Sequence, residues 1–226
     1  MNLLYWVRHG ENRANITKEF SCKRVDYSLT PKGVLQAQQT ASYFVGKDIH
    51  QIYSSPLKRA LETAEIIASK INLDVIVMEN LRETDVGDLE NQPPSAETWA
   101  IHRKVMRDWF NGKHETSFPG GEDYFTLWGR LQAGLVQILA GKTNQNIIVV
   151  GHGGMLYSAI QSLCPEIDLD WLRHAESHNC SITKLGISLQ DGQIDAKLIT
   201  WAAHDHLYGD AANLISGIPQ GDDWKK

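Results

Sequence analysis

The chain has 226 residues, of which 42% are hydrophobic and 22% are charged, and its formal net charge at pH 7 is −5. These values are typical of a folded globular protein with a full core, and they exclude extensive disorder. A mildly acidic chain without long blocks of like charge gives no reason to expect nucleic acid or an anionic membrane as a partner.

No apolar stretch approaches the roughly 20 residues that a membrane-spanning helix requires, and the apolar start is too short for a signal peptide. We therefore expect a cytoplasmic protein. The three cysteines, Cys22, Cys164 and Cys180, are odd in number and lack the spacing of a zinc site, so we expect reduced, structural thiols. The sequence leaves the oligomeric state open.

The first third of the chain alternates between short apolar runs and longer runs of helical period. Thr30-Pro31 combines a helix N-cap with proline in the first helical position, and Ser55-Pro56 is a second predicted helix start. In chain order, the prediction is a strand at 3–7, a helix at 31–45, a strand at 49–53, a helix at 55–71 and a strand at 75–78.

The remainder continues this alternation and ends differently. The segment 147–150 is the clearest buried strand, and Asp191-Gly192 is typical of a tight hairpin turn. In chain order, the prediction is helices at 95–110 and 122–139, a strand at 147–150, a helix from 153 to 163, and paired strands at 181–188 and 194–201.

Alternating strands and helices favour a mainly parallel sheet that is covered on both faces. The predicted fold class is therefore α/β, as a three-layer α/β/α sandwich. We expect a single domain over residues 1–226, with a helical cap region at about 91–140 inserted in it.

Candidate catalytic side chains follow the predicted strands. Arg8-His9-Gly10 follows the first strand, Arg59 lies in the helix after the second, Glu83 follows the third, and His152 comes directly after 147–150. Because the carboxyl ends of strands in open α/β sheets form ligand sites, these groups are expected to meet at one edge.

The residue types suit phosphate chemistry. Arginine presents a fork of donors that matches phosphate oxygens, and helix N-termini add backbone donors. An unprotonated histidine nitrogen can attack phosphorus, and a nearby carboxyl group can transfer protons. Nothing in the set demands a metal or another cofactor. Two histidine pairs, His174 with His178 and His204 with His206, lack a clear third ligand and do not predict a metal site.

The segment Leu4 to Glu11 resembles the RHG signature of the histidine phosphatase superfamily, the phosphoglycerate mutase-like proteins. The resemblance extends over nearly the whole chain. Further matching segments are, in order, Asn15, Asp26 to Gly33, Ser54 to Ala64, Leu81 to Glu90, Pro119 to Glu122, Val150 to Gly154 and His206-Leu207.

The resemblance implies a role for each candidate. His9 would be the nucleophile that becomes phosphohistidine, and Glu83 would protonate the leaving group and then activate water. Arg8, Arg59 and His152 would hold the phosphoryl oxygens. Asn15 and Gly153 would add contacts to the substrate.

One departure from the family pattern affects the phosphate pocket. Cys22-Lys23 stands where relatives often carry a polar residue and glycine, so we expect Lys23 either to supply positive charge to the substrate or to lie in a solvated loop.

Three functions remain open at this stage. Hydrolysis of a small phosphate monoester is favoured over phosphoglycerate mutase-type transfer, because the segment 88–118 is short compared with that of the mutases. The third is a non-catalytic phosphate-binding module, against which the intact set of His9, Arg59, Glu83 and His152 argues.

Overall fold

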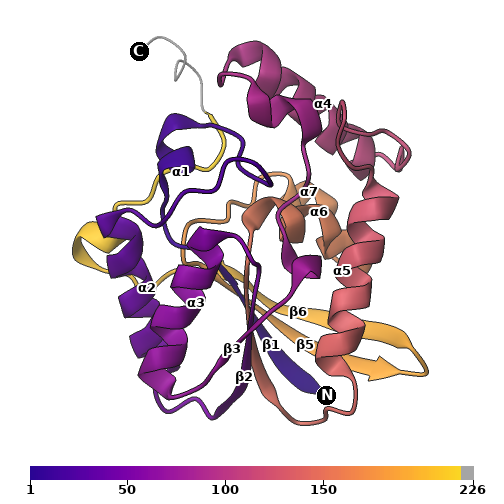
Figure 1. Cartoon of the computed structure of the whole chain (residues 1–226). Coiled ribbons are helices and arrows are strands. Elements are labelled where there is room, and N and C mark those ends of the chain that lie inside the picture. Colours follow the sequence, from indigo (N-terminus) through magenta and orange to yellow (C-terminus); the bar gives the residue numbers. More distant parts are fainter. Residues whose placement is uncertain (220–226) are drawn as a thin grey trace.

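Six strands form one central sheet in the order β3-β2-β4-β1-β5-β6 within residues 1–219, the part of the chain that the computed structural model describes (Figure 1). Four strands run parallel, and β5 and β6 pair antiparallel at one side. The strands are β1 (Asn2–Arg8), β2 (Ile49–Ser54), β3 (Val75–Val77), β4 (Asn146–Gly151), β5 (Ile182–Gln190) and β6 (Gln193–Ala203). The predicted mainly parallel sheet is confirmed.

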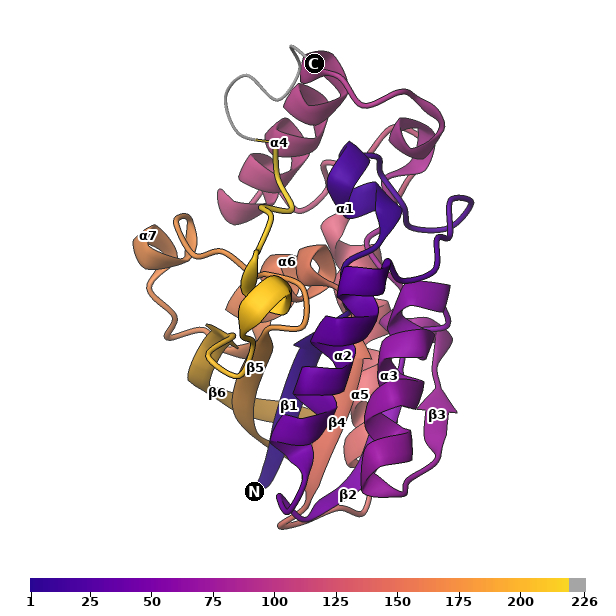
Figure 2. The ribbon, with the colours of Figure 1, turned by 90° about the vertical axis from the view of Figure 1, so that its left-hand side faces the viewer.

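Helices cover both faces of this sheet. α2 and α3 lie on one face and α5 and α6 on the other, while α1 and α4 lie beyond the carboxyl ends of the strands (Figures 1 and 2). The helices are α1 (Arg13–Thr17), α2 (Pro31–Phe44), α3 (Lys58–Ile71), α4 (Ala96–Phe110), α5 (Tyr124–Leu139), α6 (Gly153–Leu163) and α7 (Leu169–Leu172), with 3-10 turns η1 (Glu79–Leu81), η2 (Gly87–Asn91) and η3 (Gly209–Ala212). The predicted three-layer α/β fold is confirmed.

The side chains of β1 alternate between the two larger hydrophobic cores, one on each face of the sheet. Tyr5 and Val7 pack on the side of α2 and α3, whereas Leu4 and Trp6 pack into the larger cluster with α5 and α6. Successive side chains of a strand point to opposite faces, so one buried strand serves both layers.

The region expected to form a cap, 91–140, divides between two places. α4 lies above the carboxyl edge of the sheet, and α5 packs with α6 over β5 and β6 (Figure 1). The expected single domain, 1–226, extends past the described residues, because 220–226 lie outside them.

Two local differences from the sequence prediction have clear causes. α3 begins at Lys58 rather than at Ser55, because the Ser55 backbone N–H still donates to the Val150 carbonyl at 3.0 Å and continues the sheet. α1 was not predicted; its five residues are too few to show an apolar period. The predicted hairpin is confirmed, with φ of 51° at Asp191 and 78° at Gly192.

Candidate active site

The strand register brings three chain segments to the same level at the carboxyl edge. Arg8 pairs with Gly151 across β1 and β4, and Ser54 pairs with Val150 across β2 and β4. The residues that follow these strands therefore emerge side by side. His9 and His152, the next residues after β1 and β4, have ring centroids 5.3 Å apart.

The hydrogen bonds of His9 determine which ring nitrogen carries the lone pair. Nε2 receives the Arg59 Nε–H at 3.1 Å, and Nδ1 lies 2.8 Å from the Gly10 carbonyl oxygen. A guanidinium group can only donate and a carbonyl can only accept, so Nδ1 is protonated and Nε2 is not. Burial, with Arg59 and Arg8 nearby, holds the pKa of His9 well below its ordinary value of 6.5. His9 is thus neutral at pH 7, with its unprotonated Nε2 facing the Arg59 guanidinium group.

Arg59 is the central cation of the site. It lies in the first turn of α3, is 2% exposed, and contacts both histidines, since Nη2 also lies 3.3 Å from His152 Nδ1. Nη1 donates to the Ser21 hydroxyl at 3.1 Å and Nη2 to the Ser21 carbonyl at 2.7 Å. Asp26 is 3.8 Å away. Burial lowers the pKa of Arg59, and Glu83 and Asp26 oppose that shift.

His152 caps the start of α6 and is fully buried. Its Nδ1 faces Arg59, so Nε2 is the protonated nitrogen and donates to the Ser55 hydroxyl at 2.8 Å. Burial and the neighbouring Arg59 hold the pKa of His152 well below 6.5. An incoming phosphate dianion would have the opposite effect, because a nearby negative charge favours the protonated ring.

Arg8 supplies a second buried cation. Its Nη1 donates to the Ser177 carbonyl, while its buried Nε finds no hydrogen-bond partner within residues 1–219. Burial lowers the pKa of Arg8 to about 10, so the group is still charged at pH 7. A buried donor without a partner costs about 1–3 kcal/mol, and an anion would satisfy this one.

Backbone packs closely against Arg8 on two sides. A Cβ atom at Gly153 would lie 3.1 Å from Arg8 Cδ, and one at Gly217 would lie 3.0 Å from Nη2. Glycine at these positions lets the start of α6 and the C-terminal segment of the described chain approach the guanidinium group.

Glu83 joins the site from the segment after η1. Oε1 accepts the backbone N–H of Met155 at 2.7 Å and of Thr84 at 2.8 Å, and Oε2 accepts that of Gly154 at 3.2 Å. The N-terminus of α6 therefore holds the carboxyl group. Glu83 also interacts electrostatically with both Arg8 and Arg59.

Asn15 and Lys23 are the two remaining predicted substrate-binding residues, and their surroundings differ. Asn15, in α1, is linked to His9 through Asn179, whose Nδ2 donates to both Asn15 Oδ1 and the His9 carbonyl at 3.0 Å. The Lys23 side chain is 65% exposed, and its ammonium lies 3.4 Å from Asp85. Its charge is therefore shared with a carboxylate at the surface.

Three further residues that shape the site, Ser21, Ser55 and Glu90, were not among the predicted site residues. Ser21 binds Arg59, Ser55 binds His152, and the buried Glu90 accepts the backbone N–H groups of residues 22–25. Glu90 belongs to a matched motif, but only the folded chain shows that it shapes the loop that follows Ser21.

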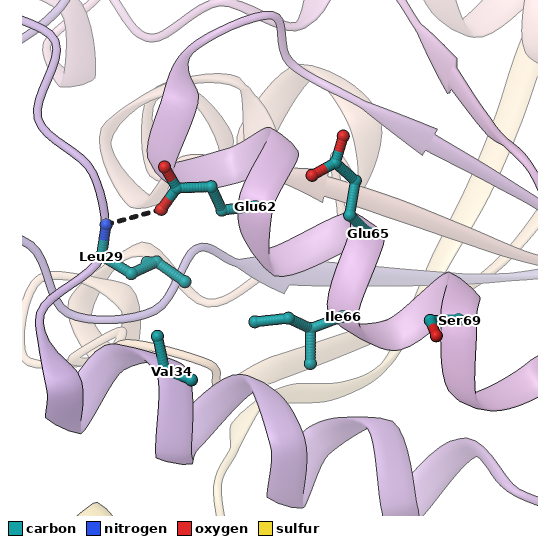
Figure 3. Close-up of a pocket in the computed structure, with 6 residues that line it drawn as sticks. All are labelled: Leu29, Val34, Glu62, Glu65, Ile66 and Ser69. Atoms are coloured by element: carbon teal, nitrogen blue, oxygen red, sulfur yellow. Dashed lines mark hydrogen bonds between the residues drawn. The ribbon is translucent and has the colours of Figure 1, made fainter.

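The described chain also has an open surface hollow. Figure 3 shows an open hollow of about 500 Å³ lined by Leu29, Val34, Glu62, Glu65, Ile66 and Ser69, none of which was a predicted site residue. Within residues 1–219, no group of three or more His, Cys, Asp or Glu side chains is arranged to hold a metal ion, and no helix is long and apolar enough to cross a membrane.

Comparison with known proteins shows the family to which the chain belongs. The family model of the histidine phosphatase superfamily (branch 1) matches residues 4–200. The chain is 32% identical over 188 residues to the putative phosphoserine phosphatase 2 of Hydrogenobacter thermophilus, covering 82% of this chain and 89% of that protein. It is 35% identical over 190 residues to the probable phosphoglycerate mutase GpmB of Proteus mirabilis, covering 80% and 83%.

Solved structures share the fold. A mutant of the phosphoserine phosphatase of Entamoeba histolytica, in complex with phosphoserine, superposes with a TM-score of 0.75 at 24% identity, covering 92% of this chain and all of that one. A mycobacterial glucosyl-3-phosphoglycerate phosphatase gives a TM-score of 0.74 at 24% identity, covering 90% of this chain and all of that one. Given the extent of the family match, the chain belongs to the histidine phosphatase superfamily (branch 1), and the enzyme class predicted from its motifs is confirmed.

Proposed function

We propose that the chain hydrolyses phosphate monoesters of small metabolites through a phosphohistidine formed on His9. The observation that carries this proposal is the tautomer of His9. Its unprotonated Nε2 lies beside Arg59, in a buried site that also contains Arg8 and Glu83. A neutral nucleophile surrounded by cations suits attack on a dianionic phosphoryl group.

In the first step, the His9 Nε2 lone pair forms a bond to phosphorus and the bond from phosphorus to the ester oxygen breaks. The departing alkoxide takes a proton from Glu83 in its carboxylic acid form. Oε2 of Glu83, which accepts one hydrogen bond, at 3.2 Å, from the described residues, is the oxygen able to carry that proton. In the second step, Glu83 takes a proton from water, the hydroxide attacks phosphorus and the nitrogen–phosphorus bond breaks. Inorganic phosphate leaves, and Glu83 is protonated again.

The two arginines stabilise the charge that spreads over the phosphoryl oxygens in both steps. Fixed donors in a site without bulk water contribute more than they would in solution, because no solvent has to reorganise. His152 becomes a third donor once the substrate dianion favours its protonated form. The proposed reaction uses no metal or cofactor.

The proposed substrate is a small phosphate ester. One relative carries the name phosphoserine phosphatase and another the name phosphoglycerate mutase. The mutase reaction is therefore the second candidate. In it, the phosphoryl group would pass from His9 to another hydroxyl instead of to water. The short segment 88–118, which contains the single helix α4, favours water as the acceptor. The intact catalytic set argues against a non-catalytic module.

A phosphate-release assay on phosphoserine, 3-phosphoglycerate, sugar phosphates and nucleotides, run with a chelator, tests the proposal. A mutase assay primed with bisphosphoglycerate runs beside it. We expect release from at least one small ester and little mutase turnover. If mutase turnover exceeds phosphate release, the mutase reaction replaces the proposed hydrolysis. If neither activity is detected, the non-catalytic phosphate-binding module is the function that remains. The cytoplasmic location stays a prediction, which cell fractionation checks.

A further inference from the structure

Asn179 lies in the loop before β5 and is only 2% exposed. Its amide nitrogen, Nδ2, donates two hydrogen bonds, one to the His9 carbonyl oxygen and one to Asn15 Oδ1, each at 3.0 Å. The partners are 170 and 164 residues away in the sequence. One side chain thus connects the backbone of the nucleophile to the helix that follows it.

The contact with Asn15 determines how that amide is oriented. Asn15 Oδ1 accepts from Asn179 Nδ2 and also from the Asn12 backbone N–H at 3.1 Å. A carbonyl oxygen has two lone pairs, and these two donors use them both. Rotating the amide by half a turn would place its NH₂ group against two N–H donors. Nδ2 is therefore the atom of the Asn15 amide that is left to donate to a ligand.

The same loop fixes the backbone that carries the nucleophile. The N–H of Cys180, the residue after Asn179, donates to the Arg8 carbonyl at 2.9 Å, and the Arg8 N–H donates to the Ser181 carbonyl at 3.1 Å. Cys180 adopts a left-handed conformation with φ of 56°, which is uncommon for a residue with a side chain. This turn directs the Cys180 N–H and the Asn179 amide to consecutive carbonyls, those of Arg8 and His9.

We propose that Asn179 is a positioning residue for phosphoryl transfer, which holds the His9 backbone in place and keeps the Asn15 NH₂ group available to a phosphoryl oxygen. The inference rests on the proposed function, because it assigns the phosphoryl site to His9. Asn179 acts through Asn15 and His9.

The test compares Asn179→Ala, Asn15→Ala and the double variant in kcat, KM and the dissociation constant of inorganic phosphate. Each single variant should lower kcat/KM and weaken phosphate binding by about 10- to 100-fold, the range for one hydrogen bond to a charged group. In the Asn15→Ala background, Asn179→Ala should cost less than about 3-fold, because the main group through which it acts is gone. Asn179→Asp, which keeps the size but presents oxygens to two acceptors, should lose at least as much.

Asn2→Ala is the matched control. Asn2 is equally buried on the same strand as Arg8, at the opposite end, and its amide also bonds two backbone groups, those of Lys142 and Gln145. This variant should lose stability with kcat/KM unchanged. If Asn179→Ala behaved like Asn2→Ala, or cost the same with and without Asn15, the positioning role would be wrong.

The phosphate titration separates this inference from the proposed function. A wild-type protein that binds phosphate but hydrolyses no ester would contradict the proposed hydrolysis, while the loss of phosphate affinity in Asn179→Ala would still support the positioning role. A wild-type protein that binds no phosphate would overturn both.

Discussion

Glu90 offers the sharpest test of how the site is built, because one carboxylate organises a whole loop. Oε1 accepts the N–H groups of Cys22 and Lys23 at 2.7 Å, of Arg24 at 3.0 Å and of Val25 at 3.1 Å, and Oε2 accepts that of Arg24 at 3.0 Å. In Glu90→Gln, the amide oxygen can still accept hydrogen bonds from the backbone N–H groups, but it carries no negative charge. The NH₂ group that replaces the second oxygen cannot accept the Arg24 N–H that it would face.

The magnitude follows from these bonds. Hydrogen bonds to a charged acceptor contribute about 1.5–3 kcal/mol and neutral ones about 0.5–1.5 kcal/mol, and donors that share one oxygen do not add. We therefore expect Glu90→Gln to lower the free energy of unfolding by about 2–3 kcal/mol, or the melting temperature by roughly 4–12 °C for a chain of this size. Because the loop begins at Ser21, which binds Arg59, KM should rise as well.

The effect should depend on pH with a defined sign. Burial raises the pKa of Glu90, but the hydrogen bonds from the loop outweigh it, and the net pKa lies below the ordinary value of 4.5. Such a group stabilises the fold fully above 4.5, and this contribution is lost as the pH falls through its folded-state pKa. The difference between wild type and Glu90→Gln should therefore shrink as urea denaturation is repeated below pH 4.5.

Glu62→Gln is the control for these measurements. Glu62 accepts one backbone N–H, that of Leu29 at 2.7 Å, and lines the surface hollow beside α3 (Figure 3). Glu62→Gln should lower the free energy of unfolding by no more than about 1 kcal/mol. Equal losses for the two variants, or a difference that grows toward acid pH, would refute the reasoning about Glu90.

Three further substitutions test individual contacts by steady-state kinetics and thermal unfolding. Arg59→Lys removes the guanidinium group that contacts both histidines and Ser21, and should lower kcat/KM by about 100-fold or more with a small change in stability. Unchanged kinetics would show that the reaction does not depend on the guanidinium group. Ser55→Ala leaves the His152 Nε2–H without its acceptor and should cost about 1–3 kcal/mol of stability; no loss would mean that the hydroxyl is dispensable. Gly153→Ala places a Cβ atom 3.1 Å from Arg8 Cδ and should reduce kcat/KM more strongly than it reduces the melting temperature. A large loss of stability with unchanged kinetics would show that this glycine matters only for the folding of α6.

The sequence predicted the parts of this structure that rest on local patterns. The apolar runs of β1 and β4 and the Thr30-Pro31 helix start each carry their signal within a few residues. Knowing that Arg8, His9 and His152 stand at the carboxyl ends of strands was enough to expect a shared edge, because parallel strands end together.

Contacts between distant segments could not be predicted in this way. Asn179 stands in a loop without a recognisable motif, and its role depends on a turn that brings it to His9. The tautomer of His9 needs the relative positions of Arg59 and Gly10, which no spacing encodes. The positive charge of Lys23 is evident from its residue type, but its ion pair with Asp85 appears only in the folded chain.

The central claim is that His9 attacks phosphorus through Nε2. The most direct measurement is to trap the phosphoenzyme with substrate, protect it from acid, and determine the modified residue by mass spectrometry and the modified nitrogen by phosphorus–proton NMR. We predict a single phosphohistidine at His9, substituted at Nε2. Phosphate on Nδ1, on another residue, or on none during turnover would contradict the account.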